Sequence, residues 1–363
     1  MRVALVDGGS FVLPYDYQLA LALTGQGIEV DFFGSRTRYN GELLEAMKKL
    51  PGASVYDRAI SGTVASRWRG ALAYLALLVG LWRRRRRYDA INLQFSVWWP
   101  LEMPFLWTMR KRLVFTVHNA VPHGFKERRH APTERIARLA RTLVFVSRST
   151  QDDFIARYGE RFLAKSRVVS HGHSPVVPGL PATRYAMAGP PKALVYWSTV
   201  KPYKGIELFK ELARSERIRA LGLGLEMHGA WAPELHALRD EIAALGVRIE
   251  DGFVDAPRLL HLLSRNVVFI LPYRAASQSG ALFSLLHHGR VFICADVGDL
   301  GDFMRRFGLG ALLMKERSAD AVADCLERLR HDEAAIVKAF QAAQDTSAWS
   351  VTTASAATIY AAA

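Results

Sequence analysis

The stretch that decides the fold is VALVDGGSFVLPYDYQLALALTGQGIEVDFF, residues 3–33. Val3–Val6 and Ile28–Phe33 are short apolar runs typical of buried strands, and Tyr15–Gly25 between them has the apolar spacing of a helix. A strand, a helix and a strand in this order predict two parallel strands joined by a crossover helix. The turn Asp7–Ser10 carries two glycines, which suit either a plain tight turn or the close approach of a ligand to the backbone. It lacks the full GxGxxG pattern of the usual dinucleotide-binding turn.

The same alternation of apolar runs and helical segments continues through most of the 363 residues. It is interrupted by residues 177–191, which are rich in proline and glycine and which we interpret as a linker. The sequence therefore predicts an α/β protein with two Rossmann-like, doubly wound domains that face a cleft. The predicted parts are an N-terminal domain at 1–176, the linker at 177–191, a C-terminal domain at 192–345 and a terminal segment at 346–363.

The composition is that of a globular protein. Half of the residues are apolar and 23% are charged, which excludes a largely disordered chain. The two cysteines, Cys294 and Cys325, can build neither a disulfide scaffold nor a four-thiolate zinc site. The first residues, MRVALVDGGS, leave no room for the apolar region of a signal peptide. We therefore expect a cytoplasmic location.

Positive charge is concentrated in the first half of the chain. Residues 1–180 contain 27 Lys and Arg against 14 Asp and Glu, whereas residues 181–363 contain 21 against 20. A fold does not require such an asymmetry, but attraction to a polyanion or to an anionic membrane benefits from it. We expect an acidic partner for the first half.

The densest basic feature is Arg67–Arg69, followed by the apolar run Ala71–Trp82 and then by Arg83–Arg87. The run has twelve residues, short of the roughly 20 that a membrane-spanning helix needs. Tryptophans at its ends and arginines beyond them suit the headgroup level of an anionic membrane surface. A buried helix followed by a solvated basic loop is an alternative. A nucleic-acid footprint is another, but no nucleic-acid-binding module is visible, so we expect no nucleic-acid partner.

Two clusters in the second half have features of a diphosphate site. Lys201 and Lys204 lie on a turn that leads to a helix N-terminus, although lysines in turns are often ordinary surface residues. Residues 271–281 end another apolar run and enter a helix, which Ser277 or Ser279 can cap. The amides at that helix start suit an anion as well as a cap.

In the first half, His118 and Asn119 follow the apolar run Leu113–Val117. A lone histidine is more often structural than catalytic. Its position beyond a strand end, on the side where the cleft is expected, favours a functional role.

Seven short motifs have a characteristic order along the chain: Gly8-Gly9, His118-Asn119 with Pro122-His123, Val146-Ser147, Ser170-His171-Gly172, Lys201-Pro202-Tyr203-Lys204-Gly205, Gly252-Phe253-Val254 and Asp296-Val297-Gly298. This order resembles the retaining GT-B glycosyltransferases of glycosyltransferase family four over nearly the whole length. The resemblance implies an enzyme whose C-terminal domain holds a nucleotide-sugar donor and whose N-terminal domain holds the acceptor. It also implies that the terminal segment is a helix crossing back to the N-terminal domain.

The resemblance also implies roles for individual residues. His118 would touch the transferred sugar, Lys201 and Lys204 would neutralise the leaving diphosphate, and Phe253 and Val254 would flank the nucleobase. The expected catalytic residues are His118, Lys204 and Asp16; the expected donor-binding residues are Gly9, Ser198, Lys201, Lys204, Phe253, Val254, Tyr273, Ser277, Gln278, Ser279 and Gly280; and the expected acceptor-binding residues are Ser10, Asn119 and His123.

One departure concerns two glutamates that members of the family usually carry eight residues apart, since Ala276 and Ser284 stand in those places. Hydroxyl, amide and backbone groups would have to hold the ribose and phosphate instead. No Asp-x-Asp pattern is present, so we expect neither a metal nor another cofactor. In a retaining reaction the leaving diphosphate can take the acceptor's proton, whereas an inverting one needs a base. His118 is then the best candidate, with Asp16 behind it.

The leading hypothesis is a metal-independent, retaining hexosyltransferase at the inner face of the plasma membrane. It would move a sugar from a nucleotide-diphosphate donor to a lipid-linked or envelope glycan, with the anionic membrane surface as a partner. One alternative is an inverting GT-B transferase of exopolysaccharide assembly. Another is a non-catalytic protein that binds anions or nucleic acid on the same scaffold.

Overall fold

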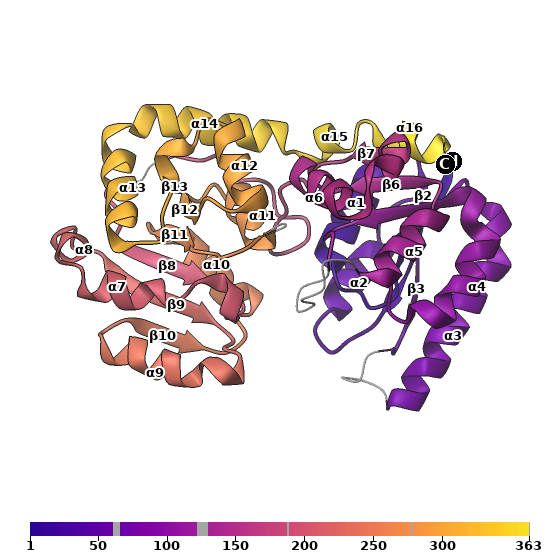
Figure 1. Cartoon of the computed structure of the whole chain (residues 1–363), viewed down its shortest axis with the longest axis horizontal. Coiled ribbons are helices and arrows are strands. Elements are labelled where there is room, and N and C mark those ends of the chain that lie inside the picture. The colour runs from indigo at the N-terminus through magenta and orange to yellow at the C-terminus, as the bar shows by residue number, and fades with distance from the viewer. Residues whose placement is uncertain (61–65, 122–129, 187–188, 277–278, 363) are drawn as a thin grey trace. The chain divides into compact units, whose positions relative to one another are not determined.

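The computed structural model describes residues 1–60, 66–121, 130–186, 189–276 and 279–362. They form two compact units, one of residues 1–172 with 347–363 and the other of residues 173–346. Each unit is a parallel sheet covered by helices (Figure 1).

In the described part of the first unit, seven parallel strands have the order β3-β2-β1-β4-β5-β6-β7. From β1 the strand order continues through β2 to β3 on one side, and from β4 it continues through β5 and β6 to β7 on the other. The switch point of the sheet therefore lies between β1 and β4. The elements are β1 (Arg2–Asp7), α1 (Leu13–Gly25), β2 (Glu29–Ser35), α2 (Gly41–Lys48), β3 (Ala53–Arg58), α3 (Arg67–Arg84), β4 (Ala90–Phe95), α4 (Trp99–Met109), β5 (Leu113–Val117), α5 (Ala131–Leu139), β6 (Thr142–Phe145), α6 (Arg148–Tyr158), β7 (Ser166–Val168), α15 (Trp349–Thr352) and α16 (Ala356–Ala361), with short 3₁₀ helices at Arg85–Arg87, Arg110–Arg112 and Glu160–Lys165.

The second unit repeats this plan with six described parallel strands in the order β10-β9-β8-β11-β12-β13. Its switch point lies between β8 and β11. The elements are β8 (Ala193–Trp197), η4 (Pro202–Lys204), α7 (Leu208–Arg214), α8 (Glu216–Ala220), β9 (Gly224–Gly229), η5 (Pro233–Leu235), α9 (His236–Ala244), β10 (Arg248–Asp251), α10 (Ala256–Ser264), β11 (Val268–Leu271), α11 (Gly280–His287), β12 (Phe292–Ala295), α12 (Gly298–Arg306), η6 (Gly310–Leu312), β13 (Leu313–Met314), α13 (Ala319–His331) and α14 (Glu333–Thr346).

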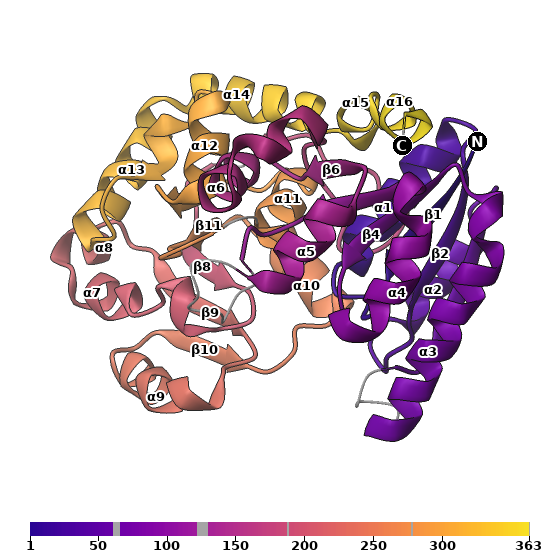
Figure 2. The same ribbon diagram turned by 45° about the vertical axis from the view of Figure 1, so that its right-hand side comes forward.

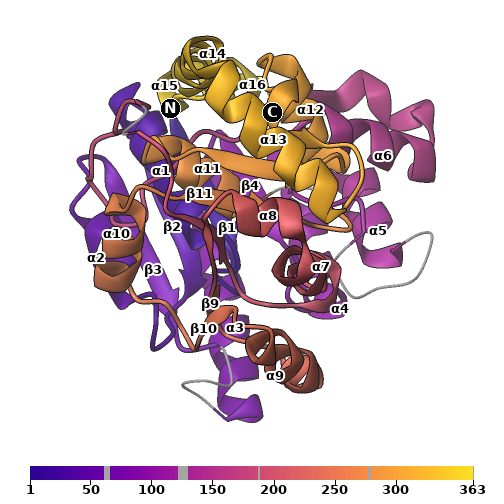
Figure 3. The same cartoon turned by 90° about the vertical axis from the view of Figure 1, so that its left-hand side faces the viewer.

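Both sheets are buried between helices, as parallel sheets usually are. In the second unit α8 packs on α13 (Figure 3). Across this contact Arg217 donates to Asp324 at 2.8 Å and to Glu327 at 3.0 Å. In the first unit α3 and α4 lie side by side on one face (Figure 2). Their apolar inner faces, including Tyr74 and Leu106, pack into the core.

The chain leaves the first unit between Gly172 and His173, not at residue 176, and the segment predicted as a linker belongs to the second unit where it is described. The reason is hydrogen bonding, since the Thr183 amide donates to the His287 carbonyl at 2.9 Å and the Gln344 side chain donates to the Thr183 carbonyl at 2.7 Å. Packing of Tyr185 on Phe340 completes this attachment.

Residues 347–363 belong to the first unit. The Gln26 side chain of α1 donates to the Thr353 hydroxyl at 3.2 Å, and Asn92 of β4 donates to the Tyr360 hydroxyl at 2.7 Å. A side chain at Gly172 would clash with Trp349, because its Cβ would lie 2.6 Å from the indole ring.

Apolar runs in the sequence do not identify two of the elements correctly. The strand β3 was not predicted, because its residues alternate in polarity and are only half-buried at the edge of the sheet. In the run Gly310–Met314 only Leu313 and Met314 form a strand, because the first three residues form the 3₁₀ helix η6. None of the helices in the described ranges is long and apolar enough to span a membrane.

Candidate active site

The donor residues expected in the second unit follow three different strands. Ser198 follows β8 and Tyr273 follows β11, so both lie at the switch point, where ligands of open α/β sheets bind. Phe253 and Val254 follow the edge strand β10, two strands away from β8. The structure therefore gathers only some of these residues in one place.

Lys204 is a buried charged group at the switch point of the second unit. Its side chain is 8% exposed, and its Nζ lies 3.6 Å from the centre of the Tyr273 ring and 5.1 Å from that of Tyr203. Burial lowers the pKa of this amine to about 8, so the ammonium form still predominates at neutral pH. No carboxylate of the described residues lies within ion-pair distance of it. The aromatic faces stabilise the cation without neutralising it.

The turn that carries Lys204 is fixed against the end of β11. Gly205 has a left-handed conformation with φ of +66°, and a Cβ there would lie 2.0 Å from the Pro272 carbonyl oxygen. The Arg274 amide donates to the Tyr203 carbonyl at 2.8 Å. These contacts require glycine at position 205 and hold Lys204 over Tyr273.

The start of α11 completes this cluster. Ser279 caps the helix by accepting from the Leu282 amide at 3.4 Å, and its hydroxyl lies 3.3 Å from that of Tyr273. Burial raises the pKa of Tyr273 to about 12, with hydrogen bonds to Ser279 and Ser198 acting in the opposite direction. No described atom lies within 4 Å of a Cβ placed on Gly280. Helix amides at such a start, beside a buried ammonium, can bind an anion.

Of the three remaining donor residues expected in this region, the structure describes only Lys201. Lys201 is exposed, and its charge is near enough to lower the pKa of Lys204 slightly. Ser277 and Gln278 lie outside the described residues.

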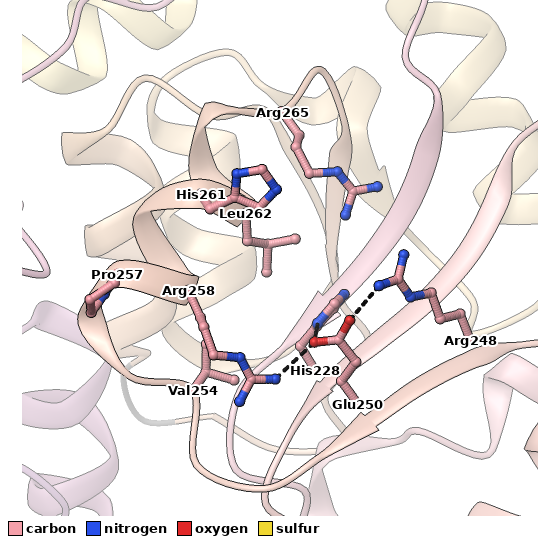
Figure 4. A pocket seen from close by; sticks show the side chains of 9 residues that line it. All are labelled: His228, Arg248, Glu250, Val254, Pro257, Arg258, His261, Leu262 and Arg265. Carbon is pink, nitrogen blue, oxygen red and sulfur yellow. Dashed lines mark hydrogen bonds and ion pairs between the residues drawn. The ribbon is translucent and has the colours of Figure 1, made fainter.

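Val254 lines a pocket of about 530 Å³ between the sheet and α10, which sequence reasoning did not predict (Figure 4). Glu250 accepts from Arg248 at 2.6 Å and from Arg258 at 2.8 Å. Deeper in, His228 lies between Glu250 and Glu226, with nitrogen-to-oxygen distances of 3.3 and 3.0 Å.

Glu226 also accepts two hydrogen bonds from Arg265, at 2.6 and 2.7 Å. These bonds lower the pKa of Glu226 to about 2, and Arg258 lowers that of Glu250. The arginines of the pocket are therefore already paired with carboxylates. The only sequence signal for this network was the alternation of charged residues along β9 and β10, which also fits an ordinary edge of a sheet.

His118 lies at the end of β5 in the first unit and is 7% exposed. Its Nε2 lies 2.8 Å from Oε1 of Gln94, so the Nε2–H donates to the amide oxygen. Its ring stacks on Phe95 at a centroid distance of 4.8 Å and meets the edge of Tyr15 at 5.0 Å. Burial, reinforced by the neighbouring His171, lowers its pKa to about 3. His118 is thus a neutral imidazole in a fixed orientation.

Asp16 was expected behind His118 as a possible base, and the structure does not support that role. Its carboxyl group is fully buried, and burial together with the nearby Asp7 raises its pKa well above the usual range. This environment disfavours the charged form of the Asp16 carboxyl group, and full burial keeps it away from an acceptor hydroxyl. Asp7 is also buried, and it accepts from the Val12 amide at 2.9 Å at the start of α1.

The acceptor residues expected from the sequence lie partly at the switch point of the first unit. The Ser10 hydroxyl accepts from the Ser35 amide at 2.8 Å, and Gly9 lies under the ring of Phe11. Asn119 is half-buried next to His118 at the end of β5, and His123 lies outside the described residues. Gln94 and Phe95 were missed, because an amide and an aromatic residue at a strand end carry no distinctive sequence signal.

Within the described ranges, no group of three or more His, Cys, Asp or Glu side chains is arranged to hold a metal ion.

A family model matches most of the first unit. Residues 15–176 match the model of Glycosyltransferase Family 4. No curated protein sequence matches the chain.

Solved structures resemble the chain over nearly its whole length. HepE from Anabaena, in complex with UDP and glucose, has 15% identity and a TM-score of 0.68 over 99% of this chain and 98% of that one. Sucrose-phosphate synthase from Thermosynechococcus elongatus has 16% identity and a TM-score of 0.69 over 99% and 98%. The lipopolysaccharide outer core galactosyltransferase WaaB has 15% identity and a TM-score of 0.65 over 99% of each chain.

The chain therefore has the GT-B fold, and the predicted class, a glycosyltransferase enzyme, is confirmed. The resemblance to glycosyltransferase family four, which rested on scattered short motifs, is confirmed through the match over residues 15–176.

Proposed function

We propose that this glycosyltransferase moves a hexose from a nucleotide-diphosphate sugar to a lipid-linked or envelope glycan, with retention and without a metal. The observation that carries the proposal is the buried ammonium of Lys204, which faces the Tyr273 ring and has no carboxylate partner in the described part of the chain. A buried charge is unfavourable unless it is compensated. An anionic donor group at the start of α11 would supply that compensation.

In the proposed reaction, Lys204 and the amides at the start of α11 stabilise the charge that develops on the departing diphosphate. The missing glutamates, replaced by Ala276 and Ser284, leave this task to uncharged groups such as Ser279 and Gly280. No carboxylate then competes with the diphosphate for the Lys204 ammonium.

The state of His118 supports retention over inversion. A general base works best when its pKa is near the operating pH. With a pKa of about 3, the His118 imidazole is a weak base for removing the proton from the hydroxyl of the acceptor substrate. We assign that proton to the leaving diphosphate. His118, held by Gln94 and Phe95, would position the transferred sugar as a neutral hydrogen-bonding group.

We further propose that the enzyme is peripheral at the cytoplasmic face of the plasma membrane, through α3 and α4. Trp68 and Leu72 of α3 are 84% and 67% exposed, and Trp82 lies farther along the same helix. Arg85 stacks over Trp82, and Arg110 stacks over the exposed Trp107 at the end of α4, each at 4.3 Å. Exposed tryptophans paired with arginines suit the headgroups of an anionic bilayer.

The donor class is tested by thermal unfolding of the full chain with UDP, GDP and ADP. The HepE structure holds UDP, so UDP is the first nucleotide to try. A ligand that binds only the native state raises the melting temperature. We expect at least one of the three to raise it in the wild type and not in Lys204→Ala. No shift with any of them, combined with tight salt-sensitive RNA binding, would favour the non-catalytic alternative.

A further inference from the structure

Phe11, at the switch point of the first unit, is a large aromatic side chain exposed to solvent. It follows the Gly8–Ser10 turn and is 62% exposed. A single exposed apolar residue needs no special explanation. Phe11 differs from such a residue because its ring is fixed in place.

Two contacts fix the Phe11 ring. One is with the backbone of Gly9, where a Cβ would come within 2.4 Å of ring atoms. The other is an edge-to-face contact with Phe95, at a centroid distance of 5.7 Å and an interplanar angle of 79°. Phe95 in turn stacks on His118 at 4.8 Å. The three rings form a continuous row from the surface to the buried imidazole.

The backbone on both sides of Phe11 is also fixed. Ser10 has a φ of +51°, unusual for a residue with a side chain, and its hydroxyl accepts from the Ser35 amide at 2.8 Å. On the other side the Val12 amide donates to Asp7 at 2.9 Å. The ring is therefore ordered before any ligand arrives, which lowers the entropy lost on binding.

We propose that Phe11 is the platform on which a pyranose ring of the acceptor stacks, so that the acceptor is recognised by a sugar and not by its lipid alone. The inference rests on the proposed function. The C–H bonds on one face of a pyranose carry partial positive charge, and the face of an aromatic ring carries partial negative charge. Ser10 precedes Phe11 and Asn119 follows His118 in the chain, so both ends of the row of rings are next to polar residues.

The test measures binding of methyl α-glucopyranoside, methyl α-mannopyranoside and methyl α-galactopyranoside to the full chain by saturation-transfer NMR. We expect at least one glycoside to bind, with transfer strongest to its ring C–H protons. Phe11→Leu keeps an apolar side chain but removes the aromatic face, and should weaken binding about fivefold. Phe11→Tyr should bind as the wild type does. Tyr39→Leu, which alters an equally exposed aromatic residue at 61%, is the matched control and should change nothing.

Three results would overturn the platform. They are wild-type binding in Phe11→Leu, weakened binding in Tyr39→Leu equal to that in Phe11→Leu, and no binding of any glycoside by the wild type. The melting temperature with UDP, GDP and ADP is measured on the same samples. A nucleotide shift without glycoside binding removes the platform alone, whereas absence of any nucleotide shift removes the proposed function.

Discussion

The ammonium of Lys204 lies 3.6 Å from the centre of the Tyr273 ring. The lysine comes from the turn after β8 and the tyrosine from the end of β11, so the pair joins the two strands of the switch point. Burial disfavours this charge and the aromatic face stabilises it, and its lack of a carboxylate partner among the described residues is the basis of the donor assignment.

Replacing Lys204 should slow the reaction. Lys204→Ala removes the cation that faces the departing diphosphate, so kcat should fall by about tenfold or more. The fold should survive, as checked by circular dichroism and thermal melting. Lys210→Ala is the control, because Lys210 is a cation of α7 in the same unit that pairs with Glu241 at 2.6 Å. Wild-type turnover in Lys204→Ala would remove the assignment.

Nucleotide affinity should depend on the ionisation of Lys204. Because its pKa is lowered to about 8, the amine loses its charge as the pH rises through about 8. The Kd for the nucleoside diphosphate, measured by calorimetry, should therefore rise over that range in the wild type and stay flatter in Lys204→Ala. Equal pH profiles for the two proteins would show that another group responds.

His118 should matter without titrating near neutral pH. His118→Ala should lower kcat by about tenfold or more, because the sugar loses a fixed hydrogen-bonding group. Since the wild-type imidazole has a pKa of about 3, the kcat profile should show no inflection from His118 near pH 6.5, its ordinary value. An inflection there that disappears in His118→Gln would instead identify His118 as a base and favour the inverting alternative.

Three histidines should make the second unit sensitive to acid. His173 and His287 share a hydrogen bond of 2.8 Å between their Nδ1 atoms, and the Val176 amide donates to Nε2 of His288 at 3.2 Å. Burial lowers the pKa of all three, to about 4 for His173 and His288.

The neutral forms are favoured in the fold, so their stabilising effect is present above about pH 6.5 and is lost as the pH falls towards 4. Asp345 favours protonation of His173, while Arg290 opposes that of His288. The melting temperature should decrease over this range, with a smaller decrease in His173→Gln. An identical decrease in that variant would exclude His173 as a contributor.

Membrane binding should depend on the exposed face of α3. The double variant Trp68→Ser with Leu72→Ser should sediment less with vesicles that contain phosphatidylglycerol, since both exposed apolar groups are lost. Leu163→Ser, which changes an exposed leucine elsewhere in the same unit, should sediment as the wild type does. Added salt should weaken binding because arginines contribute to it. Wild-type sedimentation of the double variant would argue against α3 as the contact.

The sequence was most informative about the buried strands. Val3–Val6 and the other central strands are continuous apolar runs, because both faces of a parallel sheet are covered. The edge strand β3 was missed, since half-burial leaves its pattern mixed. In Ala71–Trp82 of α3, Leu77 and Leu81 are buried whereas Leu72 is exposed, so the apolar run is only partly a core helix and membrane contact stays a prediction.

Side-chain environment was the part that sequence could not supply. The motif that contains Lys204 was visible, but its position over Tyr273 depends on residues about 70 positions apart meeting at one sheet edge. The low pKa of His118 arises from burial beside Phe95, Tyr15 and His171, which come from separate elements. The raised pKa of Asp16 likewise follows from its burial and from the nearby Asp7.

The most direct test of the account is a crystal structure of the protein with the nucleoside diphosphate that raises its melting temperature. The account predicts diphosphate oxygens in hydrogen-bond contact with Nζ of Lys204 and with the amides at the start of α11. A diphosphate bound elsewhere, or a Lys204 side chain that makes no contact with it, would contradict the account.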